Sequence, residues 1–305
     1  MMNVCTTKNT WIGEEYSPQL IETVNVMRRR EESSFNCHDY LNASLSSLGL
    51  GTIDELWRQN TAEWMFKVID FYDLDRDIVN AAMTYLDRML SVSMLHHRLS
   101  KNQCCLLSMA CLKLAIKLLE PRTFNMEDMI KLGQNRSFSP KQLVQMEHDI
   151  LFTLEWDVLP STTIEFVHHM ICMLPSDVPN STKYVIQELS KYMSELAICV
   201  YKFIGFKSSV KALAIVSVAI DSLDANSFIS TDAQCYFSLR IFDTFEIWAH
   251  DDEVIAMLKE ELNHLICHNT NLSEFVKLIL SSHKEEEVIA SGSPKSTTIN
   301  VSTSS

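Results

Sequence analysis

Apolar residues recur at intervals of three and four along most of the chain, a spacing that places them on one face of a helix. Residues 75–91 show this most clearly, because Ile78, Ala82, Leu86 and Met89 form one continuous stripe. Similar patterns predict helices at 18–31, 53–72, 100–119, 125–132, 140–154, 162–174, 183–201, 208–223, 231–248, 252–268 and 272–282. The chain is therefore predicted to be all-α.

Two of these helices, 100–119 and 208–223, are apolar on nearly every side. Such a helix belongs at the centre of a bundle, where neighbours cover all of its faces. Each is the third in a run of about five helices, so the pattern predicts a duplicated helical fold. We expect an N-terminal segment with a leading helix at 1–52, a first repeat at 53–158 and a second repeat at 159–282. Residues 283–305 are polar and rich in Ser and Thr, which predicts a disordered C-terminal tail.

The overall composition narrows the classes of partner. The 305 residues include only 6 Gly and 7 Pro, too few for the many turns of a β architecture. A formal net charge of -13 argues against a nucleic-acid partner, since phosphate binding needs clustered Lys and Arg. The N-terminus lacks a secretory signal pattern, and lysines interrupt the long apolar runs. We expect a soluble intracellular protein that has no membrane partner.

Common metal-binding and catalytic motifs are absent from the sequence. The 9 cysteines form no C-x-x-C pair and have no histidine at zinc-ligand spacing, so no metal site is expected. The sequence also lacks a glycine-rich phosphate loop, an H-E-x-x-H motif and a nucleophile elbow. We therefore expect no enzymatic activity, no catalytic residues and no cofactor.

A group of motifs in the first predicted repeat resembles the cyclin box. Arg58 and the EWMFKV segment come first, followed by YLDRMLS, the buried helix that ends near Lys117, and the MEH of residues 146–148. Their order and separation are similar to those of the cyclin family, and the resemblance extends over about 18–282. It implies two consecutive five-helix cyclin-box repeats after an N-terminal helix. It also implies a regulatory subunit that binds and activates a cyclin-dependent kinase.

The resemblance assigns roles to individual residues. Arg58 and Asp87 match a structural ion pair between the first two helices of the cyclin box. Lys117 and Glu147 match the residues with which cyclins hold the kinase beside its mobile regulatory helix. The residues expected to bind the kinase are Lys117, Glu120, Glu147, Leu151 and Trp156.

The spacing alone allows another interpretation of the same charges. Lys113, Lys117 and Glu120 are separated by four and three residues, so they would also form a solvated stripe of ion pairs on one helix. Glu147 would then be an ordinary surface residue and Trp156 a core residue. A transcription-related or adaptor protein with the cyclin fold, which activates no kinase, also stays open as an alternative function.

Several features indicate a particular group of cyclins. The DYL of residues 39–41, the W-M-x-K-V of 64–68 and the chain length resemble a D-type, G1-phase cyclin, particularly of plant-like lineages. The sequence contains no R-x-x-L or KEN motif, which mitotic cyclins normally carry, and no L-x-C-x-E motif. The implied role is control of the transition from G1 to S, in the nucleus and cytoplasm.

The last expectations concern substrates and modification. In many cyclins an M-R-A-I-L segment docks substrate peptides, and here the matching residues 57–61 read WRQNT. Trp57 and Trp64 keep part of the apolar character, but the polar Asn60 and Thr61 predict weak docking of R-x-L substrates or inhibitors. Ser293, which precedes Pro294, is a candidate phosphorylation site in the tail.

Overall fold

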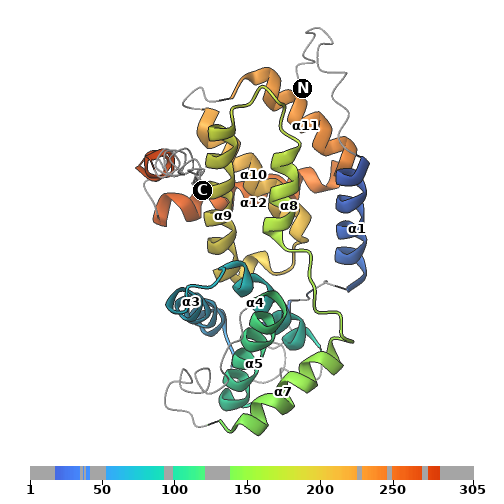
Figure 1. Cartoon of the computed structure of the whole chain (residues 1–305), viewed down its shortest axis with the longest axis vertical. Helices are drawn as coiled ribbons and strands as arrows, with labels where there is room; N and C mark the ends of the chain where they lie inside the picture. The colour runs from blue at the N-terminus through green and yellow to red at the C-terminus, as the bar shows by residue number, and fades with distance from the viewer. Residues whose placement is uncertain are drawn as a thin grey trace, which may run out of the picture.

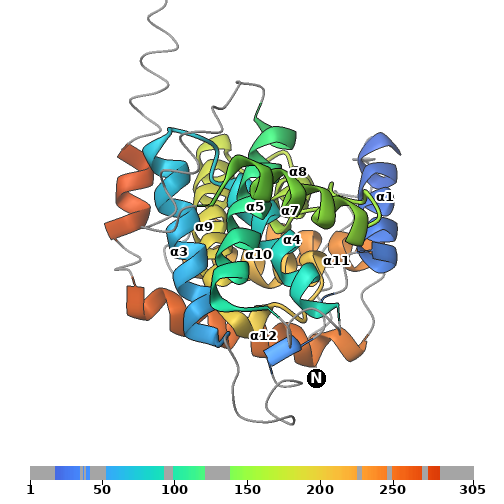
Figure 2. The same cartoon turned by 90° about the horizontal axis from the view of Figure 1, so that it is seen from below.

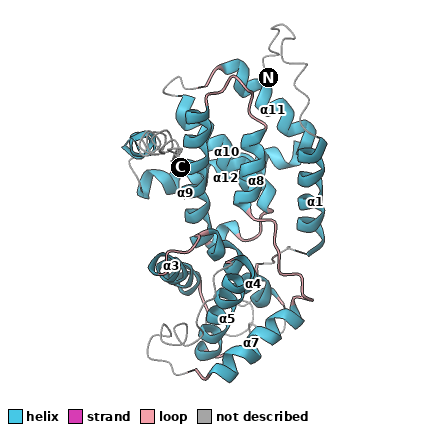
Figure 3. Ribbon diagram, in the orientation of Figure 1, coloured by secondary structure: helices cyan, strands magenta, loops and turns pink. Residues whose placement is uncertain are grey.

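The computed structural model describes residues 18–34, 37, 39–41, 53–92, 99–120, 138–224, 229–245, 249–269 and 274–281, and these ranges contain helices and no strand (Figure 3). The elements are α1 (Pro18–Ser34), α3 (Glu55–Phe71), α4 (Asp77–Ser91), α5 (Lys101–Leu119), α7 (Pro140–Thr153), α8 (Thr163–Cys172), α9 (Asn180–Cys199), η1 (Tyr201–Phe203), α10 (Ser208–Asp224), α11 (Thr231–Phe245) and α12 (Ala249–Asn269). A further helical segment covers 274–281. The prediction of an all-α fold is confirmed. The predicted helix at 125–132 and the predicted tail at 283–305 lie outside the described residues.

Side-chain caps explain where several helices begin. Ser100, Ser139 and Thr162 each accept a hydrogen bond from the backbone three residues later, and a Gln or Glu at that position bonds back. This reciprocal arrangement satisfies backbone N–H groups that would otherwise lack partners at the start of a helix. Asp54 caps α3 in a similar way through the Trp57 amide, which is why α3 begins at Glu55.

The first repeat consists of α3, α4, α5 and α7; α4 and α7 pack against α5, and α3 packs against α4 (Figure 1). Residues on all sides of α5 are buried, among them Leu107, Leu112 and Ile116. Within the described part of the chain, α5 alone has the length and hydropathy of a membrane span. Its packing against α4 and α7 accounts for that composition, because residues 106–116 in the middle of the helix are buried on every face, whereas its two ends are exposed.

The second repeat places α10 in the corresponding central position. This helix packs against α8, α9 and α12, and it contributes Ala214, Val216 and Ala219 to a second apolar core. Two separate cores therefore follow from the two nearly all-apolar stretches of sequence.

Helix α1 belongs structurally to the second repeat, although it precedes the first in the sequence. Val24 and Met27 lie in the second core, and α1 contacts α8 and α11. Figures 1 and 2 show α1 and α3 on opposite sides of the molecule. The carboxylate of Glu31 fixes this position, since it accepts hydrogen bonds from the backbone N–H (2.8 Å) and the hydroxyl (2.6 Å) of Ser209 at the start of α10. Burial raises the pKa of Glu31, and the Ser209 hydrogen bonds oppose that shift.

Candidate functional site

The structure brings Lys117 and Glu147 together on the first repeat. Lys117 lies in the last turn of α5, Glu147 lies in the middle of α7, and the two helices pack side by side. The Nζ of Lys117 donates a hydrogen bond to Oε2 of Glu147 at 3.3 Å. The side chain of Lys117 is 55% exposed and that of Glu147 only 7%. Glu147 is therefore not an ordinary surface residue, whereas Lys117 presents its charge to the outside.

Lys113 is a third member of this site, although the sequence placed it only in the alternative solvated stripe of ion pairs. Its Nζ lies 3.0 Å from the same Oε2 of Glu147, and its side chain is only 7% exposed. The solvated-stripe interpretation is therefore wrong for Lys113, because α7 covers that part of α5. Its position in the middle of a nearly all-apolar helix was the available signal, since a lysine there has to find an anion.

Exposed apolar side chains lie on or next to the two helices that carry Lys117 and Glu147. They are Leu118, Leu119, Val144, Phe152 and Trp156. Val144, His148 and Phe152 follow one another at four-residue intervals, so they form one exposed stripe along α7. The rings of His148 and Phe152 stack with their centroids 6.0 Å apart. We call the exposed side of these two helices, which carries this stripe and Lys117 paired with the buried Glu147, the α5–α7 surface.

Trp156 stands outside the core, which contradicts the interpretation of this residue as a core tryptophan. Its side chain is 65% exposed. Glu155 and Trp156 have positive φ values of 53° and 62°, a conformation that is uncommon for residues with a Cβ. The Trp156 N–H donates to the Leu151 carbonyl at 2.9 Å, which closes the end of α7 and directs the chain outward. Leu151 itself is half-buried against the first core, and Glu120 is the C-terminal cap residue of α5.

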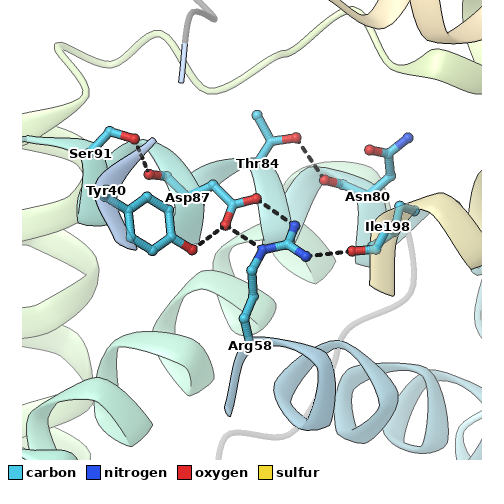
Figure 4. Close-up of polar contacts among 7 residues, drawn as sticks. All are labelled: Tyr40, Arg58, Asn80, Thr84, Asp87, Ser91 and Ile198. Carbon is cyan, nitrogen blue, oxygen red and sulfur yellow. Dashed lines mark hydrogen bonds and ion pairs between the residues drawn. The ribbon is translucent and has the colours of Figure 1, made fainter. Parts of the chain in front are cut away.

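Arg58 and Asp87 form a buried ion pair, drawn in Figure 4. The Nε and Nη2 atoms of Arg58 donate to the two carboxylate oxygens of Asp87 at 2.9 and 2.8 Å. Tyr40 also donates to Asp87, and Nη1 of Arg58 donates to the Ile198 carbonyl at 2.7 Å. Burial would lower the pKa of Arg58, but the carboxylate of Asp87 outweighs it and raises that pKa above its usual value. The pair therefore connects α3 and α4 of the first repeat with α9 of the second.

A cavity of about 60 Å³ lies beside this pair, between the two repeats. Its lining includes Arg58, Asp87, Glu31 and Lys211, together with several hydroxyl groups. Burial lowers the pKa of Lys211. Within the described ranges, no three His, Cys, Asp or Glu side chains converge on a common point where they would hold a metal ion.

The predicted substrate-docking residues lie on α3. Trp57 and Trp64 are half-buried and pack against the first core. Thr61 is buried and donates its hydroxyl to the Trp57 carbonyl at 2.8 Å, so it does not offer an apolar contact. Leu56 is exposed in the first turn of the helix. The weak docking predicted from the sequence stays a prediction, and Ser293 lies outside the described residues.

Comparison with known proteins identifies relatives of this chain in sequence. A G1/S-specific cyclin-D1 from Rattus norvegicus is 27% identical over 210 residues, which covers 67% of this chain and 69% of the relative. A relative named Cyclin-A3-2, from Oryza sativa subsp. japonica, is 30% identical over 162 residues, 53% of this chain and 40% of that protein.

Solved structures and family models that match this chain are also those of cyclins or of complexes that contain a similar fold. A viral cyclin from Herpesvirus saimiri superposes with a TM-score of 0.58 at 15% identity, over 80% of this chain and 98% of that one. A chain of the CAK complex from Chaetomium thermophilum superposes with a TM-score of 0.50 at 14% identity, over 93% and 94% of the two chains. Residues 22–159 match the family described as "Cyclin, N-terminal domain", and residues 161–291 match "Cyclin, C-terminal domain". The chain therefore belongs to the cyclin family.

Proposed function

We propose that this cyclin is a regulatory subunit that binds and activates a cyclin-dependent kinase, and that it acts in the transition from G1 to S. The observation that carries the proposal is the Lys117–Glu147 pair, which joins α5 to the helix that carries the exposed Val144–His148–Phe152 stripe. Exposed apolar side chains with polar groups around them are typical of a protein-docking surface. The similarity to a relative named as G1/S-specific supports the stage of the cell cycle.

The proposed mechanism is conformational. A kinase samples active and inactive arrangements, and a partner that binds the active arrangement more tightly shifts the population toward it. Helices α5 and α7, which pack against each other, provide the surface for this selection. All chemistry takes place on the kinase, where the catalytic lysine and glutamate have to pair and the activation segment has to open. We propose no catalytic role for this chain, and its location in the nucleus and cytoplasm stays a prediction.

A binding experiment tests this function. Tagged wild-type chain is incubated with extract of dividing cells, and the bound proteins are identified and assayed for phosphorylation of histone and retinoblastoma peptides. Lys117→Ala should lose the kinase, because a charged partner group would be left unpaired in the interface, at a cost of about 2 to 5 kcal/mol.

The matched control is Lys101→Ala, which removes an exposed lysine from the first turn of the same helix, far from Glu147. It should retain the kinase. Equal recovery of kinase with wild type and Lys117→Ala would refute the docking site. Recovery of a partner that is not a kinase would favour the adaptor alternative.

A further inference from the structure

The carboxylate of Glu147 lies between two lysines of α5 that differ greatly in exposure. The Nζ atoms of Lys113 and Lys117 lie 3.0 and 3.3 Å from the same oxygen, Oε2. The side chain of Lys113 is 7% exposed and that of Lys117 is 55% exposed. Since the two lysines are four residues apart, they approach α7 from the same face of α5. One carboxylate is thus shared by a cation inside the protein and a cation at its surface.

This sharing affects how strongly Lys117 is held. A buried carboxylate is stable only with a compensating cation, because its removal from water is costly. If Lys117 were the sole cation, a binding partner would have to compete with Glu147 for it. Lys113 supplies the compensation from inside, and the group of two lysines and one carboxylate keeps one net positive charge at Lys117. The exposed ammonium is then available to an oxygen acceptor on another protein.

We propose that Lys113 is a positioning residue: it neutralises Glu147 from inside the protein and so leaves Lys117 free to bind an acceptor on the kinase. This inference rests on the proposed function, and it specifies the chemistry of the partner group. That group is an oxygen that accepts a charge-assisted hydrogen bond from the ammonium group of Lys117. Lys113 does not touch the kinase, because its side chain is enclosed between α5 and α7.

Salt dependence distinguishes this role from a merely structural one. A net positive charge at the surface makes association with an acceptor surface weaken as the salt concentration rises. Without Lys113, Lys117 and Glu147 become an isolated neutral pair, so the charge offered to the partner falls although Lys117 is still present. A structural defect that only loosened the α5–α7 packing would weaken binding without changing its salt dependence.

The test measures the affinity of four chains for the kinase that copurifies with wild type: wild type, Lys113→Met, Lys117→Met and the double variant. Measurements are made at about 0.05 and 0.3 M salt, where screening lengths differ about 2.5-fold. Lys117→Met should weaken binding at least about tenfold and flatten the salt dependence. Lys113→Met should do the same to a similar extent, and the double variant should be no more than about threefold weaker than Lys117→Met.

The control is Lys183→Met, which removes a half-buried lysine of α9 whose Nζ donates to the Leu174 carbonyl. It should leave affinity and salt dependence unchanged. The proposal is overturned if Lys113→Met keeps the affinity and salt dependence of the wild type. It is also overturned if the losses of the two single variants multiply in the double variant, since independent effects combine in that way.

Urea unfolding of the chain alone separates this inference from the proposed function. Glu147→Gln leaves Lys113 buried without an anion, so it should unfold at a lower urea concentration than wild type. Lys113→Met with Glu147→Gln removes both charges and should recover most of that loss. If no kinase binds the wild type, the proposed function fails, whereas recovery in the double variant still supports the pairing of Lys113 with Glu147. If Glu147→Gln and the double variant unfold at the same urea concentration, the inference fails.

Discussion

Replacement of Arg58 by Met should destabilise the contact between the two repeats. Methionine has a similar length, so the change removes the charge and the hydrogen bonds with little change in volume. Three donated hydrogen bonds are lost: two to Asp87 and one to the Ile198 carbonyl. Asp87 then stays buried with Tyr40 as a remaining donor, and no cation faces its carboxylate within this group of residues.

The expected cost is about 3 to 5 kcal/mol, the range for a buried ion pair from which one partner is removed. The side chains of Arg58 and Asp87 are 4% and 7% exposed, so solvent screening does not reduce this figure much. The matched control is Arg76→Met. Arg76 also pairs with two carboxylates, Asp70 and Glu195, and one of them belongs to the second repeat, but its side chain is 40% exposed. A pair of that exposure contributes about 0 to 1 kcal/mol.

Urea unfolding followed by circular dichroism measures both variants. Arg58→Met should lower the free energy of unfolding by at least about 3 kcal/mol and Arg76→Met by about 1 kcal/mol or less. A third variant, Arg58→Met with Asp87→Leu, removes both charges and should recover part of the loss. Similar losses for Arg58→Met and Arg76→Met would refute the claim that the buried contacts of Arg58 contribute more to stability than the exposed ion pairs of Arg76.

Three further predictions concern other parts of the molecule. Phe152→Ser and Trp156→Ser should weaken kinase binding but change the free energy of unfolding by only about 0.5 kcal/mol, since both side chains are exposed; a large loss of stability would show that they belong to the core. Glu31→Ala should free α1 from α10 at a cost of about 1 to 3 kcal/mol and speed proteolysis of α1, and unchanged cleavage would argue against the Ser209 contacts as its anchor. Burial, assisted by the charge of Asp75, raises the pKa of Asp77 to about 6. The folded state therefore binds a proton at Asp77 more tightly than the unfolded state does. The resulting contribution to the free energy of unfolding is full below pH about 4 and is lost as the pH rises through 6. Asp77→Asn should therefore stabilise the protein at pH 7, by at most about 3 kcal/mol, with the gain vanishing by pH 4 in urea unfolding; a gain that is independent of pH would contradict the burial effect.

The fold could be predicted from the sequence because its determinants are local. The apolar stripe of α4 repeats at helical spacing, and caps such as Ser100 and Ser139 begin helices through hydrogen bonds to residues three positions away. The position of α1 could not be predicted in the same way. The pattern of Val24 and Met27 shows which face is buried, but not that it packs against the second repeat.

The docking residues show in the same way that contacts between separate helices could not be predicted from the sequence. The resemblance to cyclins pointed to Lys117 and Glu147, and the structure places them in contact. It did not point to Lys113, because the burial of that residue depends on how α7 crosses α5. The burial of Lys113 beside Glu147 also decides which variant tests docking best. A Glu147→Ala variant would leave Lys113 without its anion and lose stability, so Lys117→Ala is the cleaner probe of docking.

The most direct test of the central claim is the phosphorylation rate of a cyclin-dependent kinase mixed with the purified chain. Wild type and Lys101→Ala should raise the rate to the same level, whereas Lys117→Ala, with an unchanged urea unfolding curve, should leave the kinase near its basal rate. Full activation by Lys117→Ala would contradict the account, because the α5–α7 surface would then not be the place where this cyclin engages a kinase.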